Sequence, residues 1–251
     1  MHFHLPKPLH GWREFVGEVG IIVIGVLIAL GAEQVLENIH WRHQVDAGRA
    51  ALQEDFGALV ANADERDLES HCLGQRFGQI AAILQRASEA GRLPPVGPLG
   101  NPPLRPWWVD SWAGLVSSQT SLHMPREEMM SYSNIANYGE MISQWNQEEQ
   151  DDWSTLHTIV GPGRSFGDAE EASVRKALAH ATYLAKLMKL SSSQLKAQVM
   201  ATKLLSNAEI TRTRRLAEKG FAALERTQHG LCGPIGPAPA AYGSSPLAVT
   251  L

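Results

Sequence analysis

The apolar and polar residues of this chain follow two different patterns, and the first one lies near the N-terminus. Every residue in Val19–Ala32 is uncharged and most are aliphatic. Widening the window to 15–36 adds Glu18, Glu33 and Gln34 as polar interruptions, all near its ends. A helix of that length extends about 33 Å at 1.5 Å per residue, which spans the roughly 30 Å hydrocarbon core of a bilayer. The pattern predicts a transmembrane helix over 15–36.

Two other interpretations of this segment stay open. Taken alone, its uncharged centre has the length of a core helix of a soluble protein or of a signal peptide. Lys7 and Arg13 resemble the basic start of a signal peptide, and residues 29–31 (Ala-Leu-Gly) resemble a cleavage site. Glu18 at the head of the apolar run and the proline-free helical pattern through Ile39 oppose cleavage. We expect an anchor, with a secreted soluble protein released after Gly31 as one alternative.

Residues at both ends of the segment are typical of a membrane interface. Trp12 and Trp41 flank it as an aromatic belt would, and Glu18 and Glu33 lie where a charge costs less than at the bilayer centre. The bilayer is therefore the first expected partner.

Basic residues near the anchor give a weak orientation signal. Lys7 and Arg13 precede it, and Arg42 and Arg49 follow it, so the two sides are tied in Lys and Arg. Arg13 lies nearer its membrane edge than Arg42 does. We therefore expect a tail over 1–14 in the cytoplasm and the remaining domain in the periplasm.

The second pattern is an amphipathic stripe that repeats every three or four residues after the anchor. It predicts one long helix over 37–93, or two helices with a break near Asp64–Ser70. Six prolines in 94–106 then predict an extended crossover connection, because proline fixes φ and lacks an N–H donor.

Further stripes predict a helical bundle over 107–229. Pro125 fits the first position of a helix, and Asp168 with Glu171 and Ser206 with Glu209 read as capping boxes. The Gly-, Pro-, Ala- and Ser-rich residues 230–251 predict a disordered tail. We expect an all-α fold, an antiparallel bundle of four to six helices behind the transmembrane helix. Its expected core is Phe56, Phe77, Ile80, Leu84, Ile135, Ile142, Trp145, Leu178, Leu184 and Leu187.

The segment "EFVGEVGIIVIGVLIALGAEQVLE" resembles the N-terminal signature of a family of uncharacterised bacterial single-pass membrane proteins, approximately G-E-[IV]-x-[LI]-[VI]-[VI]-G-[IV]-L-I-A-L. The matching residues are Gly17, Glu18, Gly25, Leu27, Ile28, Ala29 and Leu30. Residues 32–34 depart from the Asn/Trp-rich continuation that is common in the family. "SWAGLVSSQTSLHMPREEMMSYSNI" resembles the family's W-x-x-L-x-x-S-G-x-L segment, with Gln119 where glycine is usual. The resemblance implies an anchor in the bacterial inner membrane and a helical domain, and implies no known activity.

Charge and motifs exclude several function classes. A net charge of −4 and a pI near 6.2 oppose a nucleic-acid binder, which usually has a basic face. Phosphate-binding glycine loops, H-E-x-x-H and G-x-S-x-G are absent from the sequence. His40 and His43 share a helix face and His71 adjoins a cysteine, yet two ligands do not make a zinc site. Paired carboxylates in 148–152 read as solvating charges. We expect no cofactor and no metal.

Trp107, Trp108 and Trp112 are the remaining candidates for a ligand site. Such a cluster usually closes the end of a bundle, and the alternative is a pocket for a ligand sensor or an enzyme. The leading hypothesis is a membrane-anchored interaction or scaffold protein, without catalysis, that binds an unknown protein partner or assembles as a homo-oligomer.

The two cysteines, Cys72 and Cys232, suit either a disulfide in an oxidising compartment or two free thiols. Cys72 falls within a predicted helix and Cys232 just after the last one, so a bridge between them would tie the end of the bundle to its first helix. We expect this disulfide if the domain is periplasmic.

Overall fold

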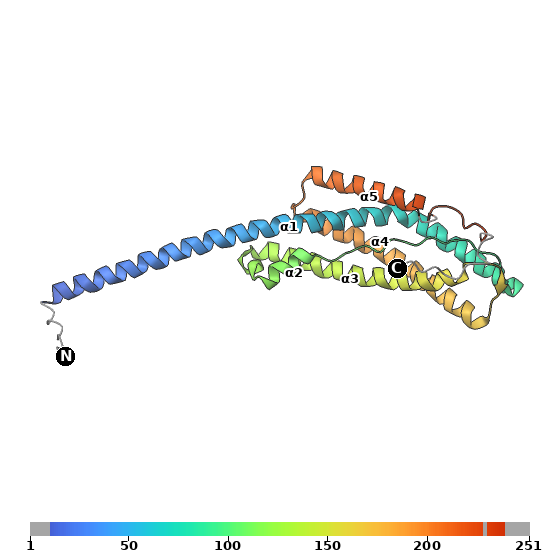
Figure 1. The fold of residues 1–251 in the computed structure, drawn as a ribbon, viewed down its shortest axis with the longest axis horizontal. Helices are drawn as coiled ribbons and strands as arrows, with labels where there is room; N and C mark the ends of the chain where they lie inside the picture. Colours follow the sequence, from blue (N-terminus) through green and yellow to red (C-terminus); the bar gives the residue numbers. More distant parts are fainter. Residues whose placement is uncertain (1–10, 228–229, 239–251) are drawn as a thin grey trace, which may run out of the picture.

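The computed structural model describes residues 11–227 and 230–238, and Figure 1 shows one helix that projects far beyond a bundle. Lys7 and the predicted tail beyond residue 238 lie outside the described residues. The fold is all-α, as the sequence predicted, with five α-helices among the described residues.

The first helix, α1 (Trp12–Ala90), is continuous from the predicted anchor into the bundle. Of the two alternatives for this region, the structure has the single helix: the backbone stays helical through 64–70, where Arg66 pairs with Glu69 and Glu149. The helix ends at Gly91, whose left-handed φ of 68° lets its N–H donate to the Ala87 carbonyl.

Short elements join the long helices and tie the loops together. The two-residue strands β1 and β2 pair antiparallel and link the start of the crossover to the loop before α4. The remaining elements are β1 (Arg92–Leu93), α2 (Asp110–Ser117), η1 (Thr120–His123), α3 (Arg126–Leu156), η2 (His157–Ile159), β2 (Arg164–Ser165), α4 (Asp168–Ala201) and α5 (Asn207–Thr227).

The proline-rich connection runs back along the length of the bundle, so α1 and α3 point the same way and α4 runs against both (Figure 1). Carbonyl groups of the crossover accept hydrogen bonds from side-chain amides of α1 and α3. Asn62 Nδ2 donates to Pro106 O at 2.6 Å, and Gln150 Nε2 donates to Pro102 O at 3.0 Å. The crossover therefore fills the seam between α1 and α3, as a proline segment without N–H donors is suited to do.

The bundle core consists of two apolar clusters, one around Leu52, Phe56 and Ile135 and one around Ile80, Leu84 and Trp153. Of the side chains expected in the core, Trp145, Leu178 and Leu187 are half-buried and the others are buried: Phe56, Phe77, Ile80, Leu84, Ile135, Ile142 and Leu184.

The ends of the later helices differ in how well the sequence predicted them. Glu209 accepts from Ser206 N at 2.7 Å and donates its own N–H to Ser206 Oγ at 3.3 Å, a reciprocal capping box. The capping box at Asp168 is wrong, because Gly167 is the capping residue and Asp168 already lies in the first helical turn. Pro125 is likewise the cap and not the first helical residue.

Candidate functional site

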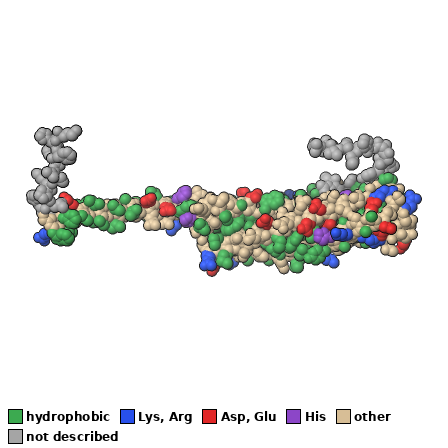
Figure 2. Space-filling model, turned by 90° about the horizontal axis from the view of Figure 1, so that it is seen from below, with side chains coloured by type: hydrophobic (Ala, Val, Ile, Leu, Met, Phe, Trp, Pro, Cys, Tyr) green, Lys and Arg blue, Asp and Glu red, His purple; other side chains and the backbone are tan. Residues whose placement is uncertain are grey.

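The apolar part of α1 has no protein neighbours among the described residues. No residue of its most apolar 18-residue window is buried, which rules it out as a core helix of this bundle. Figure 2 shows apolar side chains along this projecting part. Ile21 is 75% exposed and Ile24 is 58% exposed. One helix is thus long and apolar enough to cross a membrane.

The predicted interface residues lie at the two ends of this exposed stretch. Trp12 is 76% exposed, and Glu18 and Glu33 are also exposed. Trp41 is half-buried, donates Nε1–H to Glu37 Oε1 at 3.3 Å and stacks on His123, with ring centroids 3.8 Å apart. The bundle therefore begins at Trp41, immediately after the apolar stretch.

A buried charge cluster joins α1 to α3 in the middle of the bundle. The Arg66 guanidinium, 3% exposed, donates to both carboxylate oxygens of Glu149 at 2.6 and 2.7 Å. The same guanidinium donates to Glu69 Oε1 at 2.9 Å. Glu149 is fully buried, and the prediction that it is a solvating charge is therefore wrong. It is instead the bidentate partner of an arginine on another helix.

The crossover supplies a second cation to this cluster. Arg105 donates Nε–H and Nη2–H to the two oxygens of Glu65 at 2.6 and 2.8 Å, and its backbone N–H donates to Asn146 Oδ1 at 3.0 Å. Glu65 and Asn146 are both buried. Together with Arg66, the cluster fixes the axial register of α1, α3 and the crossover, because Arg66 on α1 pairs with Glu149 on α3 and Arg105 of the crossover pairs with Glu65 on α1.

The cluster holds three buried carboxyl groups and two guanidinium groups, and Glu69 is the least well paired of the carboxyl groups. Its Oε2 has no hydrogen-bond partner. Burial raises the pKa of Glu69 to about 8, with Arg66 lowering it and Glu149 and Glu65 raising it. A proton on Glu69 makes the cluster neutral at physiological pH.

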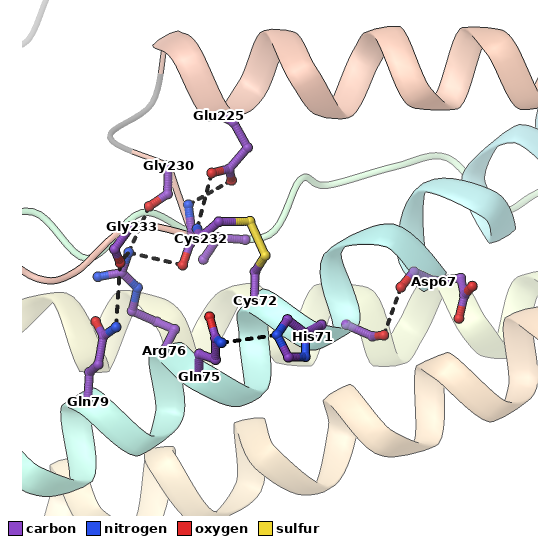
Figure 3. Close-up of a disulfide and its surroundings, with 12 residues drawn as sticks. Asp67, His71, Cys72, Gln75, Arg76, Gln79, Glu225, Gly230, Cys232 and Gly233 are labelled. Carbon is purple, nitrogen blue, oxygen red and sulfur yellow. Dashed lines mark hydrogen bonds between the residues drawn. A yellow bond between two sulfur atoms is a disulfide. The ribbon is translucent and has the colours of Figure 1, made fainter.

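A disulfide joins Cys72 on α1 to Cys232 in the segment after α5, with the two Cα atoms 4.6 Å apart (Figure 3). Arg76 Nη2 donates to the carbonyls of Gly230, Leu231 and Gly233 at 2.7, 3.1 and 3.0 Å, and Figure 3 shows the guanidinium beneath this turn. The expectation of disorder is therefore wrong for 230–238, because covalent and hydrogen bonds hold this segment against α1.

The three tryptophans do not form one ligand platform. Trp107 is 2% exposed in the core, where its backbone carbonyl lies so close to Gly139 that a Cβ there would meet it at 2.1 Å. Trp112 is half-buried against Tyr132, and Trp108 is 53% exposed. Trp107 is a packing residue, and the cavities described below have other linings.

The histidines are also dispersed. No group of three or more His, Cys, Asp or Glu side chains suited to a metal ion occurs within residues 11–227 and 230–238. His40 and His43 are exposed, and His71 contacts Gln75 at 3.0 Å. His180 Nδ1 lies 2.8 Å from Asp152 Oδ2, a pairing across α3 and α4 that the sequence did not indicate.

Several open cavities among the described residues have the size of ligand sites. One of about 610 Å³ lies at the far end of the bundle, around Arg86, Pro94 and Pro237, and one of about 260 Å³ lies between α1 and α4, around Phe77 and Lys186. A third, of about 380 Å³, lies beside Trp41 and His123 at the end of the bundle nearest the apolar segment. No family model, curated protein or solved structure matches this chain.

Proposed function

We propose that this chain is a single-pass membrane-anchored interaction or scaffold protein of the bacterial inner membrane, whose helical bundle stands on the outer surface of that membrane. The observation that carries the proposal is the exposed apolar half of α1, which continues without a break into the helix that forms the bundle core. Burial in lipid gives those side chains the apolar surroundings that the bundle does not provide.

The construction of the bundle supports a rigid, non-enzymatic role. Buried ion pairs fix its register, and a disulfide ties its last segment to its first helix. A disulfide persists in the periplasm and is rare in the cytosol, which agrees with the orientation that Arg13 favours. An anchored bundle of this kind suits binding of a protein partner or a second copy at the membrane surface.

The anchor is tested with two double variants of equal spacing on α1. Ile24→Asp with Ile28→Asp adds roughly 5–7 kcal/mol to the cost of membrane insertion, more than the apolar residues of the segment offset. Ala81→Asp with Gln85→Asp, on an exposed face of the bundle half, is the control. After alkaline carbonate extraction, the parent and the control stay in the membrane pellet and the first variant is released. Release of the parent chain contradicts the proposal.

The intact mass of the membrane-bound protein tests the secreted alternative. Residues 29–31 lie inside α1, a helical conformation that disfavours cleavage. We expect the uncleaved chain, and a mature N-terminus at Ala32 contradicts the anchor.

Orientation and partner are tested on the full chain. A C-terminal alkaline phosphatase fusion is expected to be active, and a C-terminal fluorescent-protein fusion dark, because only the former matures in the periplasm. Light scattering of the detergent-purified chain, with a quantitative pull-down from detergent extract, then separates a homo-oligomer from a hetero-complex. A strict monomer that retains no partner above the level of the carbonate-released variant contradicts the interaction role.

A further inference from the structure

The end of the bundle nearest the apolar segment has a tip formed by α2, the turn at Gln119 and η1 (Figure 1). The tip runs alongside α1 towards the apolar segment. Leu115 packs so closely on Gly48 that a Cβ there would lie 2.3 Å from its Cδ2, and His123 stacks on Trp41. The tip therefore spans the level of α1 from Gly48 to Trp41.

The Trp41 end of this level lies at the outer edge of the headgroup layer of a bilayer that holds residues 15–36. Trp41 follows Leu36 by five residues, or about 7.5 Å of helix. The headgroup region on each side is roughly 5–8 Å thick, from the difference between the whole bilayer and its hydrocarbon core. The tip is thus the part of the bundle that meets lipid headgroups.

Some side chains of the tip are buried in the bundle and others are exposed. Thr120 and Ser121 are buried, whereas Leu122 is 71% exposed and Val116 is 51% exposed. Single exposed apolar residues are common on proteins. These two lie on the one segment of the bundle that stacks against Trp41, where an apolar side chain can enter the headgroup layer.

A groove of about 380 Å³ lies between this tip and α1, lined by Asn38, Trp41, Arg42, Val45, Asp46, Arg49 and His123. Arg49 is already paired, with Asp46 at 3.0 Å and with Glu128 at 3.0 Å. Arg42 is exposed and has no hydrogen-bond or ion-pair partner among the described residues. The groove thus has a cation available to a ligand, beside an indole–imidazole stack.

We propose that this groove binds the headgroup of an anionic phospholipid, with Arg42 paired to the phosphate and Leu122 inserted beside it. A guanidinium forms charge-assisted hydrogen bonds to phosphate oxygens, and Trp41 has the amphipathic ring that favours this depth. The contact fixes the bundle upright on the bilayer instead of leaving it to pivot on α1. This inference rests on the proposed membrane anchor.

The depth of the tip in the bilayer is measured on the full chain in nanodiscs of phosphatidylcholine and phosphatidylglycerol. Nitroxide labels are attached in separate variants, Leu122→Cys, Leu190→Cys and Ile28→Cys, with the native disulfide intact. Leu190 is 58% exposed on α4, whose neighbour Lys189 lies 3.6 Å from Asp67, far along α1 from the anchor. We expect the Leu122 label to be shielded from a water-soluble nickel chelate and the Leu190 label to be fully accessible to it.

The Ile28 label separates failure of this inference from failure of the anchor. A hydrocarbon environment at Ile28 with a fully aqueous Leu122 label overturns the headgroup site and leaves the anchor intact. An aqueous environment at Ile28 overturns the proposed anchor itself.

Lipid recognition is measured by native mass spectrometry of the chain released from the same nanodiscs. Arg42→Gln is expected to lower the phosphatidylglycerol retained per chain by about fivefold, the factor for one basic contact to an anionic surface. Arg86→Gln, an exposed arginine at the far end of α1, is the matched control and leaves retention unchanged. Equal retention by the Arg42 variant and the parent overturns the proposal.

Discussion

The two halves of α1 are one helix in two different surroundings. In the first half, which contains the apolar segment 15–36, the apolar residues cover every face, and consecutive side chains such as Ile21 and Ile22 are 75% and 65% exposed. In the bundle half the apolar residues return every three or four positions, and Leu52, Phe56 and Leu59 are at most 1% exposed. The distribution of apolar residues around the helix therefore distinguishes the half that is apolar on every face and unburied from the half that packs on other helices.

The halves also differ in where their charged side chains lie. Charges of the first half, Glu18 and Glu33, lie near its ends, where water is within reach. The second half buries Glu65, Arg66 and Glu69 in its middle, where Glu149 on α3 pairs with Arg66 and Arg105 of the crossover pairs with Glu65. The bundle is consequently held by specific pairs, while the first half is an apolar surface with its charges near the ends.

Removal of the disulfide gives the largest expected effect, and only in the bundle half. The bridge closes a loop with a sequence separation of 160 residues. In the chain-entropy account this stabilises the bundle by up to about 5 kcal/mol. Cys72→Ala with Cys232→Ala should lower the denaturation midpoint of the detergent-solubilised chain, and carbonate resistance should stay unchanged. An unchanged midpoint contradicts the assigned role of the bridge.

Matched phenylalanine substitutions test the comparison directly. Phe56 is fully buried, with its ring centroid 5.6 Å from that of Tyr132. Phe56→Ala should lower the unfolding free energy of the bundle by about 3–5 kcal/mol. Phe15, 40% exposed in the anchor, is the control, and Phe15→Ala should leave the same unfolding curve in place. Equal losses from both variants would mean that the anchor half packs on the bundle.

The buried cluster predicts a pH dependence for the bundle half. The pKa of Glu69 is raised from 4.5 to about 8 by burial, so between these values the folded chain holds a proton that the unfolded chain has released. The unfolding free energy should therefore fall as pH rises through this window, by at most about 1.4 kcal/mol per pH unit. This contribution is fully present below pH 4.5 and lost above pH 8.

Glu69→Gln keeps a neutral side chain of the same shape and should flatten this slope. Glu54→Gln, at an exposed position of α1, is the control and should keep the slope of the parent. Denaturation midpoints measured between pH 4.5 and pH 8 give the slope of each variant. A slope in the Glu69 variant equal to that of the parent contradicts the raised pKa assigned to Glu69.

Local patterns were sufficient for the parts of the fold that depend on neighbours in sequence. The apolar run before Leu36, the stripe through Phe56 and the capping box at Ser206 all depend on spacing along one segment. The sequence also named Cys72 and Cys232 as a pair, because the chain has two cysteines.

The charge cluster was missed because it forms only in three dimensions. The charges around Arg66 appeared to interrupt an amphipathic helix, and those around Glu149 appeared to be solvated. Each is instead the partner of the other across 83 residues. The available signal was weak: oppositely charged runs on two proline-free helices, with Arg105 in the connection between them.

The smallest expected effect lies at the junction of the two halves. Gln119 has a left-handed φ of 62° at the turn between α2 and η1, a conformation that favours glycine. Gln119→Gly should therefore stabilise the bundle by up to about 1 kcal/mol, because relief of backbone strain exceeds the added chain entropy.

The control for this turn is Ser117→Gly, two residues earlier in the last turn of α2. That backbone is helical, so glycine there should destabilise the bundle by about 0.5–1 kcal/mol. Thermal denaturation of the two variants should shift in opposite directions from the parent. A loss of stability in both would mean that the Gln119 side chain holds the tip in place through contacts that outweigh its strained φ, and glycine would then loosen the tip from Trp41.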